Sequence, residues 1–234
     1  LVTELAEHFD VTPETIRRDL TALDRSGALR KVHGGAIPAP APPETGVTQR
    51  EQVNPSAKQA IARTALERLD LAPGTTLLVD AGTTAGALAR LLPADRELTI
   101  ITNSVLTAAS LAAAGHSRVR ILGGQLRGLT QAAVGPEAIE TLSTLRVDVA
   151  VLGANGVSAA HGLSTPDPDE ATVKRAMVRS ARQVVALVDS TKIGQEHLVS
   201  FASLDAIDLL VTDVELPPAL TDQLAAAETE VLVA

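Results

Sequence analysis

The stretch Thr75-Thr76-Leu77-Leu78-Val79-Asp80-Ala81-Gly82-Thr83-Thr84 is the part of the sequence on which the fold prediction depends. Its apolar centre is typical of a buried strand, and its polar end runs into a helical pattern. A glycine, two hydroxyls and free backbone N–H groups at the start of a helix would suit an anion such as phosphate. The stretch therefore predicts a strand, a candidate phosphate-binding turn and a helix.

The same alternation of apolar runs and helical patterns continues from residue 57 to the carboxyl terminus. The expected strands are 75–80, 98–102, 119–122, 147–153, 184–189 and 209–212, and the expected helices are about 57–70, 84–92, 104–114, 135–144, 169–182 and 217–227. Buried strands that alternate with helices indicate an α/β domain with a largely parallel sheet.

Polar residues follow several of these strands, where parallel sheets collect their ligands. They are Thr102-Asn103-Ser104, Gly123-Gly124, Ala154-Asn155-Gly156 and Asp189-Ser190-Thr191-Lys192. Any one of these groups taken alone is most often just the cap of the next helix. Their recurrence favours a polar pocket at this edge of the sheet.

The amino-terminal segment predicts two short helices. Residues 1–9 have apolar positions at helical spacing, and a second helix is expected from Pro13 to Arg25, capped by Thr12 and ending before Gly27. Its expected buried face comprises Ile16, Leu20 and Leu23. Two helices joined by so short a turn are typical of a helix-turn-helix.

Leu29–Ala36 predicts a basic hairpin, or wing, after the second helix. The whole chain of 234 residues has a net charge of −8, but residues 17–31 carry five basic and two acidic side chains. A helix that reads base edges beside a wing that contacts phosphates would use this charge. The alternative is an ordinary surface helix with a Glu14–Arg18 pair and a solvated turn.

A proline-rich segment, 38–54, separates the two parts. With Pro38, Pro40, Pro42 and Pro43 it favours an extended, semi-rigid linker, which either adjusts the spacing of the two parts or is a passive spacer. The expected domains are therefore 1–37, the linker 38–54, and 55–234.

Composition excludes several functions. The chain has no Cys, Trp or Tyr and two Phe, which argues against disulfides, thiolate chemistry and aromatic stacking platforms. The five histidines show no metal-ligand spacing, so we expect no metal, no cofactor and no catalytic residues. No apolar run is long enough to span a membrane, and we expect a cytoplasmic protein with no membrane partner.

Two blocks together, Thr15–Leu20 (TIRRDL) and Val32–Ala36 (VHGGA), closely resemble the DeoR family of bacterial transcriptional repressors. The resemblance implies a winged helix-turn-helix that binds double-stranded operator DNA. It also implies that a first helix, which normally precedes the segment starting at Leu1, is missing here. The residues it assigns to operator contact are Thr12, Thr15, Arg17 and Arg18, and those assigned to the wing are Arg30, Lys31 and His33.

The carboxy-terminal part resembles the effector domain of the same family through Asp80–Thr84, Thr102–Ser104, Gly123-Gly124, Glu170–Met177 and Val188–Lys192. That domain is similar in fold to ribose-5-phosphate isomerase and the coenzyme A transferases, and senses a phosphorylated sugar. The resemblance implies phosphate contacts from Gly82, Thr83, Thr84 and Lys192, and hydroxyl contacts from Asp80, Asn103, Asn155, Asp169 and Lys174, with Ser104, Gly123 and Gly124 also in the effector site. The stretch Gly162–Asp169 resembles regulators of hexose use, so fructose 1-phosphate or a similar ketose phosphate is the candidate effector.

An isomerase-like enzyme is the alternative function. Such a reaction needs a carboxylate base, and the position that supplies an acid in the isomerase alignment is Asn155 here, although Asp169 and Glu170 lie nearby in the sequence. We therefore expect a regulator rather than an enzyme, acting as a homo-oligomer, a dimer or tetramer, because paired half-sites need at least two heads.

Overall fold

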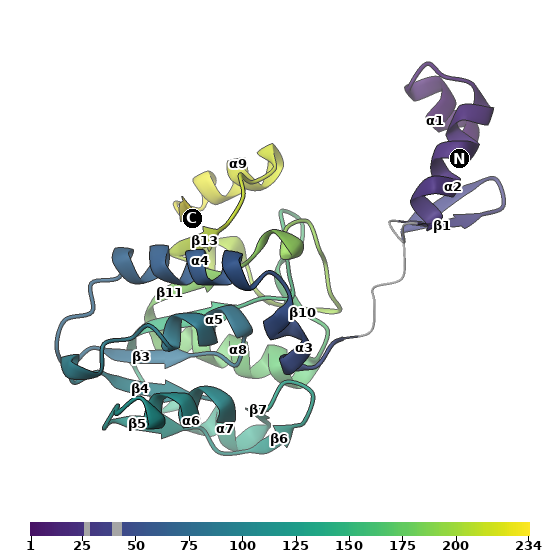
Figure 1. Cartoon of the computed structure of the whole chain (residues 1–234). Coiled ribbons are helices and arrows are strands. Elements are labelled where there is room, and N and C mark those ends of the chain that lie inside the picture. The colour runs from purple at the N-terminus through teal and green to yellow at the C-terminus, as the bar shows by residue number, and fades with distance from the viewer. Residues whose placement is uncertain (26–28, 39–43) are drawn as a thin grey trace. The chain divides into compact units, whose positions relative to one another are not determined.

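The computed structural model describes residues 1–25, 29–38 and 44–234. The chain forms two compact units, Leu1–Glu44 and Thr45–Ala234 (Figure 1). The predictions that concern Gly27 and the prolines at 40, 42 and 43 lie outside the described residues.

The first unit contains α1 (Val2–His8), α2 (Pro13–Arg25) and an antiparallel hairpin of β1 (Leu29–Val32) and β2 (Gly35–Pro38). The Thr12 hydroxyl accepts a hydrogen bond from the backbone N–H of Thr15 at 3.2 Å, which is the predicted cap. The predicted helix-turn-helix with a following hairpin is thus the observed order of elements.

One residue of the predicted buried face of α2 is not buried. Ile16 and Leu20 pack with Val2 and Ala6, but Leu23 is 44% exposed. The cause is the small core of this unit. Among its described residues, the four buried apolar side chains of this core lie on α1 and on α2 up to Leu20. The core does not reach the last turn of α2.

The second unit is built on a parallel sheet of seven strands in the order β14-β13-β11-β8-β3-β4-β5. The strands are β3 (Thr76–Val79), β4 (Thr99–Thr102), β5 (Val119–Ile121), β8 (Val147–Gly153), β11 (Ala181–Leu187), β13 (Leu209–Thr212) and β14 (Glu230–Val233). All six predicted strands belong to it, and every pairing within the sheet is parallel. The predicted α/β fold is confirmed; β14 was not predicted.

Helices cover both faces of this sheet (Figure 1). One apolar layer includes α4 (Pro55–Arg68), α5 (Thr83–Ala89) and α6 (Val105–Ala113), and the other includes α7 (Pro136–Ser143), α8 (Pro168–Ser180) and α9 (Pro218–Ala226). Leu77 and Val79 of β3 enter the first layer and Leu78 enters the second. Burial on both faces explains why the strands read as continuous apolar runs.

Smaller elements complete the unit. A hairpin of β6 (Gln125–Arg127) and β7 (Ala132–Val134) follows β5. A three-stranded antiparallel sheet combines β9 (Gly156–Ser158), β10 (Gly162–Thr165) and β12 (Val199–Ala202). Three short 3-10 turns are also described: η1 (Ala94–Arg96) between α5 and β4, η2 (Ser190–Lys192) between β11 and β12, and η3 (Leu204–Ala206) between β12 and β13.

The end of the expected linker is a helix, α3 (Val47–Gln52). The Val47 side chain is 5% exposed, and its backbone N–H donates to the Leu129 carbonyl at 2.9 Å. Residues 47–52 therefore pack on the second unit instead of continuing the extended segment. One buried valine among polar residues makes no helical periodicity, which is why the sequence pattern did not reveal this helix.

Candidate functional site

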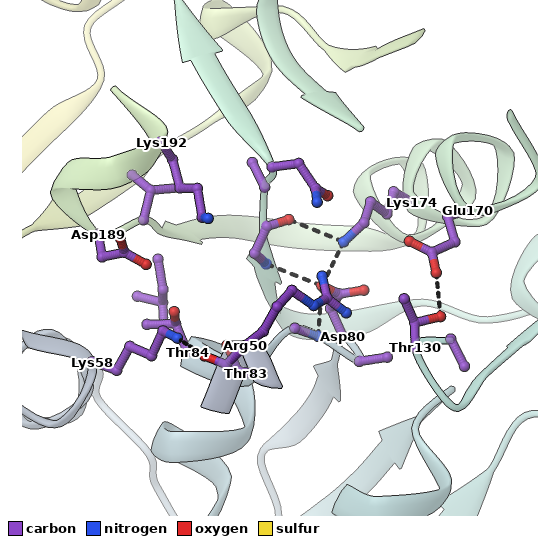
Figure 2. A pocket seen from close by; sticks show the side chains of 18 of the residues that line it. Arg50, Lys58, Asp80, Thr83, Thr84, Thr130, Glu170, Lys174, Asp189 and Lys192 are labelled. Atoms are coloured by element: carbon purple, nitrogen blue, oxygen red, sulfur yellow. Dashed lines mark hydrogen bonds and ion pairs between the residues drawn. The ribbon is translucent and has the colours of Figure 1, made fainter. Parts of the chain in front are cut away.

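A polar cavity lies at the carboxyl ends of β3, β8 and β11 (Figure 2). The residues that line it from these strand ends and from β4 are Asp80, Ala81, Gly82, Thr83, Thr84, Asn103, Gly153, Ala154, Asn155, Leu187, Val188, Asp189 and Lys192. The remaining lining residues are Thr45, Arg50, Val53, Lys58, Thr130, Ala132, Glu170 and Lys174. The sequence predicts ligand contacts at these same strand ends, because parallel sheets bind their ligands at the carboxyl ends of the strands.

A buried ion pair forms the centre of the cavity. The Asp80 carboxylate, 2% exposed, accepts from the Lys174 ammonium at 2.5 Å and from the backbone N–H groups of Gly82 and Gly153 at 3.1 Å each. Lys174 also donates to the Gly153 carbonyl at 3.0 Å and lies 5.3 Å from the centre of the Phe201 ring. The pair thus ties β3, β8 and α8 together, and both charges are largely satisfied by the protein itself.

Gly82 allows the ends of β3 and β8 to approach each other closely. A Cβ atom at this position would lie 3.0 Å from the Asp80 carboxylate and 3.3 Å from the Gly153 Cα. Any larger residue would push apart the two strand ends that hold Asp80.

Three more cations line the cavity: Arg50 from α3, Lys58 from α4, and Lys192. In Figure 2, Lys58 and Lys192 lie beside Asp189, whereas Lys174, Glu170 and Thr130 lie on the opposite side. The Lys58 ammonium is buried and donates to the backbone carbonyl of Arg50. The Arg50 Nε is buried and has no hydrogen-bond partner within the described residues.

Burial lowers the pKa of Lys58. The carboxylates of Asp189 and Glu51 act in the opposite direction, whereas the cations of Lys192 and Arg50 lower this pKa further. Like charges held together at a partly dry site favour an anionic ligand, which would relieve their mutual repulsion.

Glu170 belongs to a separate network on the far side. Its carboxylate accepts from the Thr130 hydroxyl and from Arg127 at 3.2 Å, and Arg127 also contacts Asp167 at 2.9 Å. The Asp167 side chain accepts from the backbone N–H of Glu170 at 2.9 Å and so caps α8. This network joins the β6–β7 hairpin to the start of α8.

Asp169 was predicted in the site, but the structure places Glu170 there instead. Asp169 is exposed and does not line the cavity, whereas Glu170 is 6% exposed and does. The reason is geometric, because neighbouring positions on a helix point about 100° apart.

Three more predicted residues lie outside the cavity lining. Ser104 caps α6, its hydroxyl accepting from the Thr107 N–H at 3.1 Å. Gly123 and Gly124 lead from β5 into the β6–β7 hairpin, and a Cβ atom on Gly124 would lie 2.4 Å from the Val134 carbonyl oxygen. These positions serve local structure, a cap and a close backbone approach.

The structure adds Arg50, Lys58, Thr130 and Glu170 to the predicted set. Nothing in the sequence signalled Arg50 and Lys58, because they precede the first strand and reach the cavity only through the packing of α3 and α4. Thr130 lies in the turn of the β6–β7 hairpin. Glu170 could have been predicted from the sequence, because it belongs to the Glu170–Met177 segment that resembles the effector domain of the family.

In the first unit, most of the residues assigned to DNA lie together. Thr12, Thr15, Arg17, Arg18 and Lys31 line one shallow depression, and Arg17, Lys31 and His33 line a neighbouring one. Lys31 donates to the Thr21 hydroxyl at 2.7 Å and Arg17 to Glu14 at 2.8 Å. Arg30 lines neither depression, because successive residues of a strand point to opposite faces.

Residues 1–25, 29–38 and 44–234 hold no cluster of three or more His, Cys, Asp or Glu side chains that could bind a metal. None of the helices in this part of the chain combines the length and apolar character that crossing a membrane requires.

Comparison with known proteins gives matches to both units. Residues 53–214 match the family model described as the DeoR C terminal sensor domain, and residues 1–39 match the DeoR-like helix-turn-helix domain. The chain is 38% identical over 232 residues to the HTH-type transcriptional regulator GlpR of Haloferax volcanii, covering 99% of this chain and 90% of that protein. It is 33% identical over 214 residues to the glycerol-3-phosphate regulon repressor of Escherichia coli K12, covering 92% of this chain and 84% of that protein.

Among solved structures, a D-ribose-5-phosphate isomerase in complex with phospho-erythronic acid matches with a TM-score of 0.39 and 19% identity, over 58% of this chain and 52% of that chain. The expectation that a first helix is missing is not supported, because the helix-turn-helix model matches residues 1–39.

Proposed function

The chain belongs to the DeoR family of transcriptional regulators, and on that premise we propose that the cavity of its second unit binds the phosphate of a phosphorylated sugar or polyol and thereby controls operator binding by its first unit. The family assignment also decides against the isomerase alternative, since the family and the two relatives compared are regulators rather than enzymes.

The observation that carries this proposal is the surplus of positive charge in the cavity. Of the charged groups that line it in the described chain, Asp80 pairs with Lys174, and Glu170 pairs with Arg127 outside the lining. Asp189 is the one further carboxylate that lines the cavity with Arg50, Lys58 and Lys192, and Glu51 acts on Lys58 from outside the lining. A phosphate monoester carries close to two negative charges at neutral pH and would balance this surplus.

The hydroxyl groups of Thr83 and Thr84 border the same cavity and can donate to phosphate oxygens. We assign the phosphate to these hydroxyls and the three cations, and the remaining polar groups to the body of the effector. Gly82 is not among the phosphate donors, because its N–H already donates to Asp80. Asp80 and Lys174 bond mainly to each other and so act as the frame of the site rather than as its principal ligand contacts.

The relatives support a phosphorylated carbon chain as the effector class. One is named a glycerol-3-phosphate regulon repressor. We propose glycerol 3-phosphate and fructose 1-phosphate as the first compounds to test on this chain.

For the DNA side, we propose that α2 enters the major groove of double-stranded operator DNA. Thr12, Thr15, Arg17 and Arg18 then face base edges and the nearest phosphates, while Lys31 and His33 of the wing contact flanking phosphates. Paired half-sites require two heads, so we propose a homodimer or a tetramer.

Helix α3 is the element that connects effector binding to operator binding in this proposal. It is the first element of the second unit after the segment that leads from the wing, and its Arg50 lines the cavity. An effector that binds Arg50 therefore binds the element at the end of the linker. Coupling requires that two arrangements of α3 differ in their affinity for the effector and that the same two arrangements differ in their affinity for the operator.

Titration of the complete chain on DNA from upstream of its own gene, with and without sugar phosphates, tests the proposal. We expect one of them to change operator affinity, and Lys192→Ala to abolish that response while operator affinity without effector is retained. Arg182→Ala is the matched control, since Arg182 is exposed and lies outside the cavity lining. An unchanged response in Lys192→Ala would remove Lys192 from the phosphate site, and the absence of operator binding would overturn the DNA part.

A further inference from the structure

Asp213 holds the turn that carries Lys192. It directly follows β13 and is not among the residues that line the cavity. Its Oδ1 accepts from the backbone N–H of Ser190 at 2.6 Å, and its Oδ2 accepts from the Ser190 hydroxyl at 3.1 Å. Ser190 is the first residue of η2, and Lys192 is the last. One carboxylate thus binds the beginning of this turn with both of its oxygen atoms.

The parallel sheet explains why Asp213 meets this turn. β13 lies beside β11 with Val211 opposite Leu187, and the backbone N–H of Val188 donates to the Val211 carbonyl at 3.0 Å. The carboxyl ends of the two strands therefore lie side by side, so the residue that follows β13 lies next to the turn that follows β11. The sequence assigned ligand contacts to the end of β11 but no role to the end of β13.

The backbone N–H groups of all three residues of η2 donate to the protein itself. Ser190 donates to Asp213, Thr191 donates to the Asp189 carboxylate at 3.1 Å, and Lys192 donates to the Asp189 backbone carbonyl at 2.9 Å. The hydroxyl groups of Ser190 and Thr191 donate to the same two carboxylates. A phosphate that binds to this turn must therefore take its hydrogen bond from the Lys192 ammonium.

The chain after Lys192 is fixed as well. The backbone N–H of Gly194 donates to the Val157 carbonyl at 2.8 Å, and that of His197 donates to the Ser164 hydroxyl at 3.0 Å. Contacts with β9 and β10 thus hold the chain after Lys192, and the contact with β13 holds the chain before it. Because a lysine side chain has many rotamers to lose on binding, a fixed backbone lowers the cost of placing its ammonium.

We infer that Asp213 is a positioning residue of the phosphate site and acts through Lys192. This inference rests on the proposed phosphate site and adds to it a residue from outside the cavity. The Asp213 carboxylate holds the turn so that the Lys192 side chain lines the cavity (Figure 2). Its role depends on hydrogen-bond geometry rather than on charge, since a negative charge held near the site disfavours a phosphate.

The test is isothermal titration of the complete chain with inorganic phosphate, glycerol 3-phosphate and fructose 1-phosphate. Asp213→Ala removes both bonds to the turn. Asp213→Asn keeps an oxygen for the Ser190 N–H and offers its N–H₂ group to the Ser190 hydroxyl oxygen. Asp208→Ala is the matched control, because Asp208 accepts from the backbone N–H of Val184 at 2.6 Å and so joins the same two strands at the beginning of β13.

We expect Asp213→Ala to weaken binding about 10-fold and Asp213→Asn to bind within about 2-fold of the natural chain or more tightly. Asp208→Ala should lower the urea midpoint but leave the affinity within about 2-fold. In a Lys192→Met background Asp213→Ala should cause no further loss of affinity, because the ammonium through which Asp213 acts is absent. The backbone amide of Ser190 should exchange its hydrogen about 10-fold faster in Asp213→Ala than in the natural chain.

The outcomes separate this inference from the proposed function. Equal affinity of Asp213→Ala and the natural chain, or unchanged exchange of the Ser190 amide, would overturn the role of Asp213 and leave the phosphate site standing. The same conclusion follows if Asp213→Asn loses as much affinity as Asp213→Ala, or if the loss persists in the Lys192→Met background. If none of the three ligands binds the natural chain, the phosphate site fails together with this inference.

Discussion

Lys58 links effector binding to pH. Because burial lowers its pKa, the unfolded chain holds this proton more tightly than the folded, unliganded chain, so Lys58 makes the free energy of unfolding rise with pH between the lowered and the ordinary pKa. A bound phosphate dianion stabilises the charged ammonium and raises the same pKa again. Binding should therefore take up a proton in this pH window and weaken as pH rises through it.

Calorimetric titration in pairs of buffers that differ in ionisation enthalpy measures this proton uptake. In Lys58→Met the uptake should disappear, since the side chain can no longer carry the proton. Equal proton uptake by the natural chain and Lys58→Met would show that another group is responsible.

Asp80 and Lys174 illustrate how a buried pair behaves when one partner is lost. Asp80→Asn leaves the Lys174 ammonium buried without its carboxylate, and we expect a loss of about 3–5 kcal/mol in the free energy of unfolding. The double variant Asp80→Asn/Lys174→Met should recover much of this loss, because no unpaired charge remains and the asparagine oxygen can still accept from Gly82 and Gly153. Urea denaturation of Asp80→Asn, Lys174→Met and the double variant measures these losses. A loss in the double variant equal to the sum of the two single losses would contradict the pairing.

Among the elements, α3 is the one whose stability should depend most on the effector. It is six residues long, and among its described anchors are the buried Val47 side chain, the bond from Val47 to the Leu129 carbonyl and the bond from Lys58 to the Arg50 carbonyl. So short a helix is marginal by itself. A phosphate held by Arg50 and Lys58 adds a further tie, and we expect the backbone amides of Arg50 and Val53 to exchange about 10-fold more slowly with effector bound.

Hydrogen exchange read by mass spectrometry or NMR measures this protection. Arg50→Gln should lose most of the added protection at saturating effector, with Arg63→Gln on the neighbouring helix as the control outside the cavity lining. Unchanged exchange of α3 on saturation of the natural chain would exclude it as the coupling element.

Helix α2 and the wing should contribute to DNA binding in different ways. Lys31 on the wing is assigned to a phosphate, so Lys31→Ala should weaken binding to operator and unrelated DNA alike and reduce the slope of log K against log salt by about 0.9. Arg18→Ala should mainly reduce the preference for the operator, because early α2 side chains face base edges. Arg30→Ala should have a smaller effect than Lys31→Ala, since Arg30 lies outside the depression that Lys31 lines. Fluorescence anisotropy at several salt concentrations separates these effects, and an equal loss on both DNAs in Arg18→Ala would contradict its assignment.

In the whole molecule, the sequence was sufficient for six of the seven strands of the parallel sheet but not for the complete cavity. Leu77 to Val79 are buried on both faces, so the strand is visible as an apolar run, and Asp80 follows from the rule that ligands meet strand ends. Arg50 and Lys58 reach the cavity only through tertiary packing, which cannot be predicted from the local hydrophobic periodicity of the sequence. To predict that Glu170 rather than Asp169 lines the cavity, the rotational position of α8 would have to be known to within one residue. The exposure of Leu23 depended on the size of the neighbouring core.

The division into two compact units leads to a last prediction, about unfolding of the complete chain. In the described part of residues 1–44 the core has four buried apolar side chains, whereas residues 45–234 contain two large apolar layers. We therefore expect two transitions in differential scanning calorimetry, the smaller unit unfolding at the lower temperature. Effector at 100 times its Kd adds about 2.7 kcal/mol to the unit that binds it, which should raise the upper Tm by about 5 to 10 °C.

The lower transition should move far less, because α3 transmits only the difference in effector affinity between its two arrangements. Operator DNA should produce the opposite pattern and raise the lower transition. A single transition that shifts as a whole with either ligand would show instead that the two units unfold as one, and that effector and operator are coupled through the global stability of the chain rather than through α3.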